Sequence, residues 1–239
     1  EKKITQYPPV SVIICARNED TNLKQHLPKI LAQDYPAFEV IVVDDNSDDG
    51  TTEYLFFLSQ KEPRLKRTKT GNSNRMMAGK KFPLTLGLKA AANELVVLTD
   101  ADCYPATNQW LKQVVSGYAT DDKAIVLGYG AYEKKPGRLN RRIRYETFLT
   151  ALNYLSFALA KLPYMGVGRN LSYQKGLFFS TNGFFDHRHI PSGDDDLFIN
   201  KTATKHNTAV VIDPDAVTRS IPKTTWGSWL RQKSRHYTT

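Results

Sequence analysis

The segment Leu95–Asp102 limits the possible folds of this chain more than any other part of the sequence. Four apolar residues are followed at once by Thr99, Asp100, Ala101 and Asp102. An unbroken apolar run of this kind is typical of a strand buried on both faces, as in a parallel sheet. In an extended backbone, carboxylates at i and i+2 point to the same side, where they can bind a hard divalent cation and its phosphate ligands. The same pair can also open a turn, so its meaning depends on the rest of the chain.

Strands and helices alternate through the first half of the sequence. Buried strands are expected at 10–16 and 38–43, each followed by a polar loop and an amphipathic helix. The pattern predicts an α/β fold, Rossmann-like, with a mostly parallel central sheet flanked by helices. Ligands of such sheets bind outside the carboxyl ends of the strands, at the topological switch point. We therefore expect Asp45 and the 95–102 carboxylates to converge there.

Local signals give more detailed expectations. Asn18, Asp20 or Thr21 is expected to cap the first helix, and Pro28 to kink or shorten it. The basic, glycine-containing segment 64–81 has little apolar pattern and is interpreted as a loop. No G-x-G-x-x-G follows the first strand and no Walker-A motif is present. Classical dinucleotide and P-loop sites are therefore disfavoured.

The second half of the chain changes character. A strand is expected at 124–130, followed by a basic run at 134–144 and an aromatic-rich helix at about 145–161. That helix can lie in a membrane interface or can be a core helix with a solvated basic flank. The segment 226–236 is predicted to be a basic amphipathic helix.

Composition narrows the class of partner and the setting. The net charge of +9 suits an anionic partner such as a nucleotide, lipid headgroups or nucleic acid. Cys15 and Cys103 lack metal-site spacing and are expected to be reduced, which is typical of a cytosolic setting. No signal peptide is visible and no segment is apolar enough to span a bilayer. The 239 residues suffice for one large α/β domain or two small ones.

Four segments, taken in order, resemble the family 2 glycosyltransferases with a GT-A fold. They are 10–19, 42–51, Gly79-Lys80 and Asp100-Ala101-Asp102. The first two are similar to the family's opening strand with its nucleoside loop and to its second motif. The last two match its Gly-Lys and its Asp-x-Asp. The resemblance implies a single GT-A domain over 1–239, with a nucleotide-sugar half at about 1–130 and an acceptor-binding half at about 131–239.

The resemblance also assigns roles to residues. It implies nucleotide-sugar contacts from Ala16, Arg17, Glu19, Asp45, Lys80, Asp100, Ala101, Asp102, Gln232 and Arg235. Asp102 would bind the metal, Mg²⁺ or Mn²⁺. Gly193 stands where the family usually has Glu. Asp194 and Asp195 are therefore both candidates for the catalytic base. Gln232 and Arg235 fall where membrane-associated members carry Gln-x-x-Arg-Trp, with His236 in place of Trp.

The sequence therefore predicts an inverting, metal-dependent glycosyltransferase that uses a nucleoside-diphosphate sugar, with UDP expected, and a glycan or lipid-linked acceptor. We expect a membrane surface as a further partner and no nucleic acid. The expected location is the cytoplasmic face of the cell membrane, as the catalytic part of a larger membrane protein. Two other functions stay open. One is a nucleotidyltransferase on a similar sheet, and the other is a non-catalytic basic module that binds membranes or nucleic acid.

Overall fold

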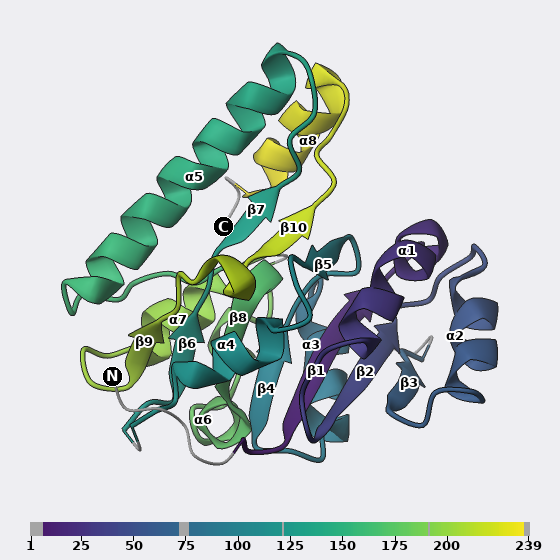
Figure 1. The fold of residues 1–239 in the computed structure, drawn as a ribbon, viewed down its shortest axis with the longest axis horizontal. Helices are drawn as coiled ribbons and strands as arrows, with labels where there is room; N and C mark the ends of the chain where they lie inside the picture. The colour runs from purple at the N-terminus through teal and green to yellow at the C-terminus, as the bar shows by residue number, and fades with distance from the viewer. Residues whose placement is uncertain (1–6, 72–76, 121, 191, 237–239) are drawn as a thin grey trace.

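Helices cover both faces of a seven-stranded sheet, and a smaller three-stranded sheet lies at one end of it (Figure 1). This computed structural model describes residues 7–71, 77–120, 122–190 and 192–236, without the side chains of 235 and 236. The large, mostly parallel sheet flanked by helices confirms the predicted fold class.

The main sheet has the strand order β3-β2-β1-β4-β8-β6-β9. Its strands are β1 Val10–Ala16, β2 Phe38–Asp44, β3 Leu65–Lys69, β4 Leu95–Leu98, β6 Ile125–Leu127, β8 Leu171–Gln174 and β9 Thr208–Val210. Strands β1 to β4 pair in parallel, whereas β8 is antiparallel to both β4 and β6. The chain builds outward from β1 to β3 and then returns to the other side of β1 with β4. The switch point therefore lies between the carboxyl ends of β1 and β4.

The remaining elements flank this sheet or extend it. The second sheet, in the order β5-β10-β7, consists of β5 Cys103–Pro105, β7 Gly130–Tyr132 and β10 Thr218–Ser220. The helices are α1 Asp20–Leu31, α2 Thr51–Ser59, α3 Lys81–Ala90, α4 Trp110–Ser116, α5 Arg138–Leu159, α6 Lys175–Ser180, α7 Asp196–Thr202 and α8 Trp226–His236. Short 3-10 helices occur at Gly168–Asn170, Phe185–His187 and Pro214–Ala216.

Two hydrophobic clusters fix β1 at the centre of the molecule. Val12 and Ile14 pack in one cluster with α1 and α4, while Ile13 packs in the other with α3. All three side chains are almost fully buried. Full burial of each such side chain stabilises the fold by about 1.5–3 kcal/mol. The carboxyl end of β1 is therefore a rigid support for the loop that follows it.

The start of the first helix differs from expectation. Its leading N–H groups, on Glu19 and Asp20, donate to the side chains of Thr51 and Asp49, so the cap comes from the loop after β2. The expected cap from Asn18, Asp20 or Thr21 was wrong. Pro28 does not end α1, because the helix continues past it to Leu31, and the expected kink stays a prediction.

The expected loop at 64–81 contains a strand. In β3, Leu65 is buried while Lys66, Arg67 and Lys69 are exposed, as befits the edge of a sheet. A charged edge strand has the composition of a loop, which is why the pattern was misleading.

The expected strand at 124–130 is two strands in different sheets, β6 and β7. Between them, a Cβ on Gly128 would lie 2.6 Å from the Asn170 side chain, so only glycine lets the backbone pass there.

The helix expected at about 145 begins earlier, at Arg138, so much of the basic run is helical. Asn140 fixes the N-terminal end of α5. Its side chain accepts a hydrogen bond from Lys135 N–H at 2.8 Å and donates one to Glu133 O at 2.9 Å. In the described part of the chain, no helix combines the length and apolarity needed to cross a membrane.

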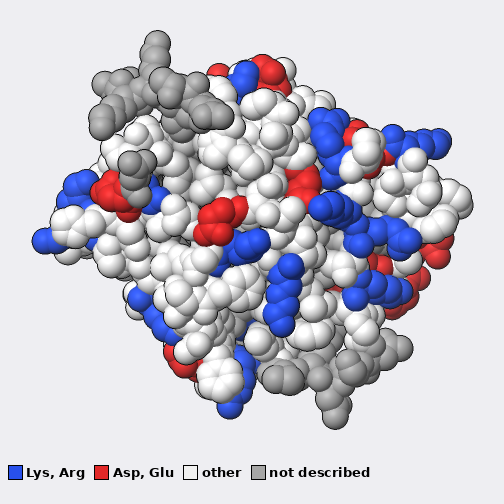
Figure 2. Space-filling model, turned by 90° about the horizontal axis from the view of Figure 1, so that it is seen from below, with Lys and Arg blue, Asp and Glu red and all other residues white. Residues whose placement is uncertain are grey.

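Charged side chains of both signs occur on the end of the molecule that lies below the view of Figure 1. Figure 2 shows Lys and Arg grouped over the centre and one side of this face, with Asp and Glu among them. The excess positive charge of the chain is thus not one uniform patch on this face.

Candidate functional site

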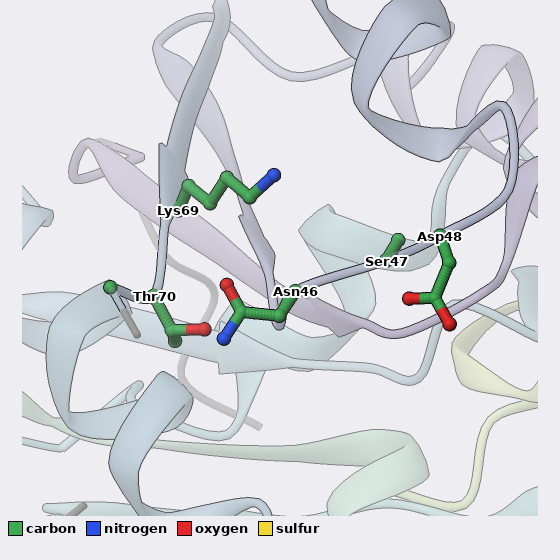
Figure 3. Close-up of a pocket in the computed structure, with 6 residues that line it drawn as sticks. Asn46, Ser47, Asp48, Lys69 and Thr70 are labelled. Carbon is green, nitrogen blue, oxygen red and sulfur yellow. The ribbon is translucent and has the colours of Figure 1, made fainter. Parts of the chain in front are cut away.

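The carboxyl ends of β2 and β3 border a polar pocket of about 510 Å³ (Figure 3). The residues that line it are Asn46, Ser47, Asp48, Lys69, Thr70 and Gly71. Asp45 lies beside it, where its carboxylate accepts a hydrogen bond from Thr70 Oγ1 at 2.8 Å. The Asp45 N–H also donates to Ala16 O at 2.7 Å. Two of the predicted nucleotide-binding residues are therefore held at adjacent strand ends.

The loop after β1 is fastened to the loop after β2. Asn18 N–H donates to Ser47 Oγ at 3.0 Å, and Asp48 N–H donates to Asn18 Oδ1 at 2.8 Å. These bonds hold Arg17, which is exposed, and Glu19, which is half-buried, at the rim of the switch point.

The two carboxylates after β4 form a cluster with a neighbouring thiol. One ligand atom from each of Asp100, Asp102 and Cys103 lies within 4.8 Å of the others. Burial, followed by the charge of Asp102, raises the pKa of the Cys103 thiol well above its ordinary value. The thiol therefore stays protonated at neutral pH, and it contacts Asp102 Oδ1 at 3.4 Å and Ser220 Oγ at 2.9 Å. Two carboxylates are the donor set that Mg²⁺ and Mn²⁺ prefer, so the residues present fit such an ion.

Negative charge is concentrated around this cluster. Burial and then the Asp100 carboxylate raise the pKa of Asp102. Burial likewise raises the pKa of Glu19, against the hydrogen bond from Asn22, and the charges of Asp102 and Asp100 add to the increase. Three carboxylates thus face a common region, and a bound cation would relieve their repulsion.

Lys80 connects the cluster to the far side of the site. Its Nζ forms an ion pair with Asp100 Oδ1 and lies 3.9 Å from Asp194 Oδ2. Burial lowers the pKa of Lys80, but Asp100 and Asp194 outweigh that effect and raise it well above its ordinary value. Lys80 is therefore a permanent positive charge between carboxylates that come from two distant parts of the sequence.

Asp194 and Asp195 occupy different environments. The Asp195 carboxylate accepts from Gly168 N–H at 2.7 Å and from Asp196 N–H at 2.9 Å, so it caps α7 and holds a neighbouring loop. Asp194 faces Lys80 instead. Burial, opposed by Lys80 and reinforced by Asp195 and Asp100, raises the pKa of Asp194 to about 6.

The loop that carries these aspartates is held by a buried lysine that sequence reasoning did not single out. Lys81 is fully buried, and its Nζ donates to Ile190 O at 2.8 Å and to Ser192 O. Gly193 follows with a φ of 81°, a conformation that favours glycine. Lys81 and Gly193 together direct the backbone so that Asp194 meets Lys80.

We expect Lys81→Met to destabilise the protein by about 2 kcal/mol, because it removes a buried donor from the part-buried carbonyl groups of Ile190 and Ser192. Urea unfolding measures the change. Lys89→Met, an exposed lysine on the same helix, is the matched control and should change stability by less than about 0.5 kcal/mol. Equal stability of the two variants would contradict the role given to Lys81.

Arg169 is a further charged group at the site that the sequence did not reveal. Burial lowers its pKa, but Tyr132, Cys103, Asp100 and Asp102 together raise it above its ordinary value. Its guanidinium carbon lies 4.7 Å from the centre of the Tyr132 ring. In the sequence, Arg169 is only a single arginine before a buried strand. That pattern is too common to indicate a functional residue.

The structure brings Gln232 toward the site from the C-terminal helix. Gln232 Nε2 donates to the Tyr132 hydroxyl at 3.3 Å, and Tyr132 in turn packs against Arg169. Ala101 is buried between the two carboxylates, and its carbonyl lies 3.3 Å from His26 Nδ1. The side chain of Arg235 lies outside the described part of the chain.

Two solved structures with similar folds are complexes with nucleotide sugars. The mannosyltransferase PcManGT from Pyrobaculum calidifontis, in complex with GDP-Man and Mn²⁺, aligns over 99% of this chain and 64% of its own, with a TM-score of 0.75 and 26% identity. S. aureus TarS 1-349 in complex with UDP-GlcNAc aligns over 91% of this chain and 59% of its own, with a TM-score of 0.64 and 20% identity. The predicted GT-A fold is therefore confirmed.

Sequence relatives agree with the structural ones. The probable glycosyltransferase YdaM of Bacillus subtilis (strain 168) is 26% identical over 98% of this chain, which spans 56% of that protein. The beta-monoglucosyldiacylglycerol synthase of Synechocystis sp. is 29% identical over 59% of this chain and 28% of its own length. The family model for Glycosyl transferase family 2 matches residues 11–186, well over half of the sequence. This chain therefore belongs to glycosyl transferase family 2.

Proposed function

We propose that this chain transfers a sugar from a nucleoside-diphosphate sugar to an acceptor hydroxyl, with inversion at the anomeric carbon. The observation that supports this most is the pairing of Lys80 with Asp100 on one side and Asp194 on the other. It joins an oxygen-rich cation site at the switch point to a carboxylate with a pKa of about 6. Residues at about 1–130 would hold the donor and those at about 131–239 the acceptor.

The nucleoside would lie at the carboxyl ends of β1, β2 and β3. Asp45 and Ala16 are fixed there by their mutual hydrogen bond, and Arg17 and Glu19 lie at the rim of the switch point. A UDP-sugar, as the sequence suggests, stays a prediction. The Pyrobaculum neighbour binds GDP-Man, so both nucleotides belong in the test.

Asp102, with Asp100 beside it, would hold Mg²⁺ or Mn²⁺. When bound, the ion offsets the negative charge that develops on the departing diphosphate. Lys80 and Arg169 are fixed positive charges on the same region, and both can hold phosphate oxygens by charge-assisted hydrogen bonds. Their placement would keep the diphosphate oriented while the bond between the anomeric carbon and the diphosphate oxygen breaks.

Asp194 is the better candidate for the catalytic base. Both carboxylate oxygens of Asp195 accept backbone hydrogen bonds, which commits that side chain to the cap of α7. Asp194 faces Lys80 and has a pKa near neutrality, as a base requires. It would accept the proton of the acceptor hydroxyl as that oxygen attacks the anomeric carbon. Direct attack on the face opposite the diphosphate inverts that centre.

The acceptor would be a glycan or a lipid-linked molecule. Support for a lipid acceptor comes from the Synechocystis relative, whose name describes a synthase of a glucosyl diacylglycerol. A screen of acceptors, scored by released nucleoside diphosphate, identifies the class.

Titration calorimetry with UDP and with GDP, each with and without Mn²⁺, tests the donor site. We expect one of the two nucleotides to bind, with an affinity that Mn²⁺ increases at least about tenfold through the added phosphate coordination. Failure of both nucleotides to bind in the presence of Mn²⁺ or Mg²⁺ would overturn the proposed function.

We expect the rate to depend on the ionisation of Asp194. Because the base must be unprotonated, kcat/KM should fall about tenfold for each pH unit below about 6 and should level off above it. A pH–rate profile with saturating metal measures this. A profile that is flat from about pH 4.5 to about pH 7.5 would exclude Asp194 as the base.

A further inference from the structure

Helix α5 has two faces of different character. Its inner face buries Ile143, Ala151, Tyr154, Leu155 and Ala158, and the Tyr154 hydroxyl donates to Gly128 O at 2.7 Å. These contacts anchor the helix to the body of the protein. With 22 residues it is about 33 Å long. In Figure 1 it runs along one margin of the molecule, with the sheets and α8 to one side of it.

The outer face of α5 carries a stripe of large apolar side chains. Its exposed members are Tyr145 (62%), Phe148 (51%), Leu149 (36%), Leu152 (48%) and Leu159 (59%). Their spacing of i, i+3, i+4, i+7 and i+14 places them on the same side of the helix. Scattered exposed apolar residues are ordinary, but an aligned set of this size marks an interaction surface.

The same stripe continues into basic residues at its N-terminal end. Arg138 and Arg141, both exposed, precede Tyr145 by seven and four residues and so share its side of the helix. Lys161, also exposed, follows the helix at its other end. The acidic residue of α5, Glu146, is turned to α8, where it pairs with Lys233 at 3.1 Å. Apolar side chains flanked by basic ones complement an anionic lipid surface.

A second copy of this chain fits the stripe less well. Parallel pairing would bring the arginines of both copies together, and antiparallel pairing would bring them toward Lys161. Neither arrangement offers a carboxylate, since the one carboxylate between Arg138 and Leu159, Glu146, is turned to α8. Both copies also carry a net charge of +9. A bilayer with anionic headgroups offers both an apolar interior and a negatively charged surface.

We propose that the outer face of α5 docks on an anionic lipid bilayer. The apolar side chains from Tyr145 to Leu159 enter the interface, while Arg138 and Arg141 contact anionic headgroups. Strand β7 precedes α5 directly and carries Tyr132, which contacts both Arg169 and Gln232. Docking would therefore place the catalytic site close to molecules held in the membrane. The proposal concerns a surface outside that site and does not depend on the transfer reaction.

Co-sedimentation of the 239-residue chain with lipid vesicles tests the proposal. Vesicles of phosphatidylcholine with about one-third phosphatidylglycerol should bind it, and vesicles of phosphatidylcholine alone should bind at least about tenfold less. Phe148→Ser with Leu152→Ser should weaken binding about tenfold or more, because apolar area no longer enters the interface. Arg138→Gln with Arg141→Gln should weaken it to a similar extent and reduce its dependence on salt.

Matched controls come from α2, away from the stripe. Phe57, exposed to 65%, and the exposed Lys61 just after the helix can be changed to Ser and Gln. These variants should bind vesicles like the parent, and circular dichroism should show that every variant is folded. Equal loss of binding in stripe and control variants would overturn the proposal. So would absence of vesicle binding, or a chain that dimerises in light scattering and becomes monomeric only when the stripe is changed.

Discussion

Asp102→Asn should lower kcat about 10²- to 10³-fold, which is the cost of losing one electrostatic contact to the charge that develops in the transition state. The substitution keeps the size of the side chain but replaces a charged oxygen ligand with a neutral amide. The increase in nucleotide affinity caused by Mn²⁺ should vanish with it. Steady-state kinetics and calorimetry on the same protein measure both effects.

The control for Asp102→Asn is Asp122→Asn. Asp122 pairs with Lys123 just before β6, at the amino end of a strand that runs parallel to β4 and so at the edge opposite the site. Its replacement should change turnover less than about twofold. Full turnover of Asp102→Asn would contradict the proposal that Asp102 holds a metal ion needed for the reaction. If Asp194→Asn also kept full turnover, Asp194 would not be the base, whereas a parent chain without any turnover would be a binding module.

Asp194→Asn should lower kcat by about 10²- to 10⁴-fold, because it removes the carboxylate that we propose takes the proton of the acceptor hydroxyl. Donor binding should stay within about threefold of the parent, since Lys80 keeps its ion pair with Asp100. This separation of turnover from binding distinguishes a base from a residue that merely shapes the donor pocket. A parallel loss of nucleotide affinity would contradict the assignment.

A second prediction for Asp194→Asn concerns the stability of the fold. The pKa of Asp194 is raised from 3.8 to about 6, so the folded state binds this proton more tightly than the unfolded state does. Its contribution to stability is therefore complete below about pH 4 and is lost as the pH rises through 6. Relative to the parent, Asp194→Asn should gain about 2–3 kcal/mol between about pH 4 and pH 8. Urea unfolding at both pH values measures the difference.

Asp195→Asn tests the division of labour between the two aspartates. An Asn side chain still accepts a hydrogen bond but loses the charge that favours the N-terminus of α7. We expect a loss of stability of about 1 kcal/mol and a smaller loss of turnover than Asp194→Asn causes. A greater loss of turnover than in Asp194→Asn would transfer the role of base to Asp195.

The sequence by itself determined the α/β class and the strand ends at which we propose the donor site. Continuous apolar runs can be strands buried on both faces, and the acidic residues directly after them must emerge at the carboxyl edge. Asp45, Asp100 and Asp102 were found for that reason, because strand ends are local features. The structural and sequence relatives then confirmed the fold and the family that the motifs had indicated.

Only the tertiary structure decided where charges from distant segments meet. Strand β8 inserts antiparallel between β4 and β6, and this pairing brings Arg169, just before it, toward Asp102. The buried amine of Lys81 positions the Asp194 loop across about 110 residues of sequence. Much of the basic run 134–144 lies in α5, and β3 is a strand. Contacts with neighbouring elements, rather than local composition, stabilise both. Such contacts depend on long-range packing and leave no local periodicity to read.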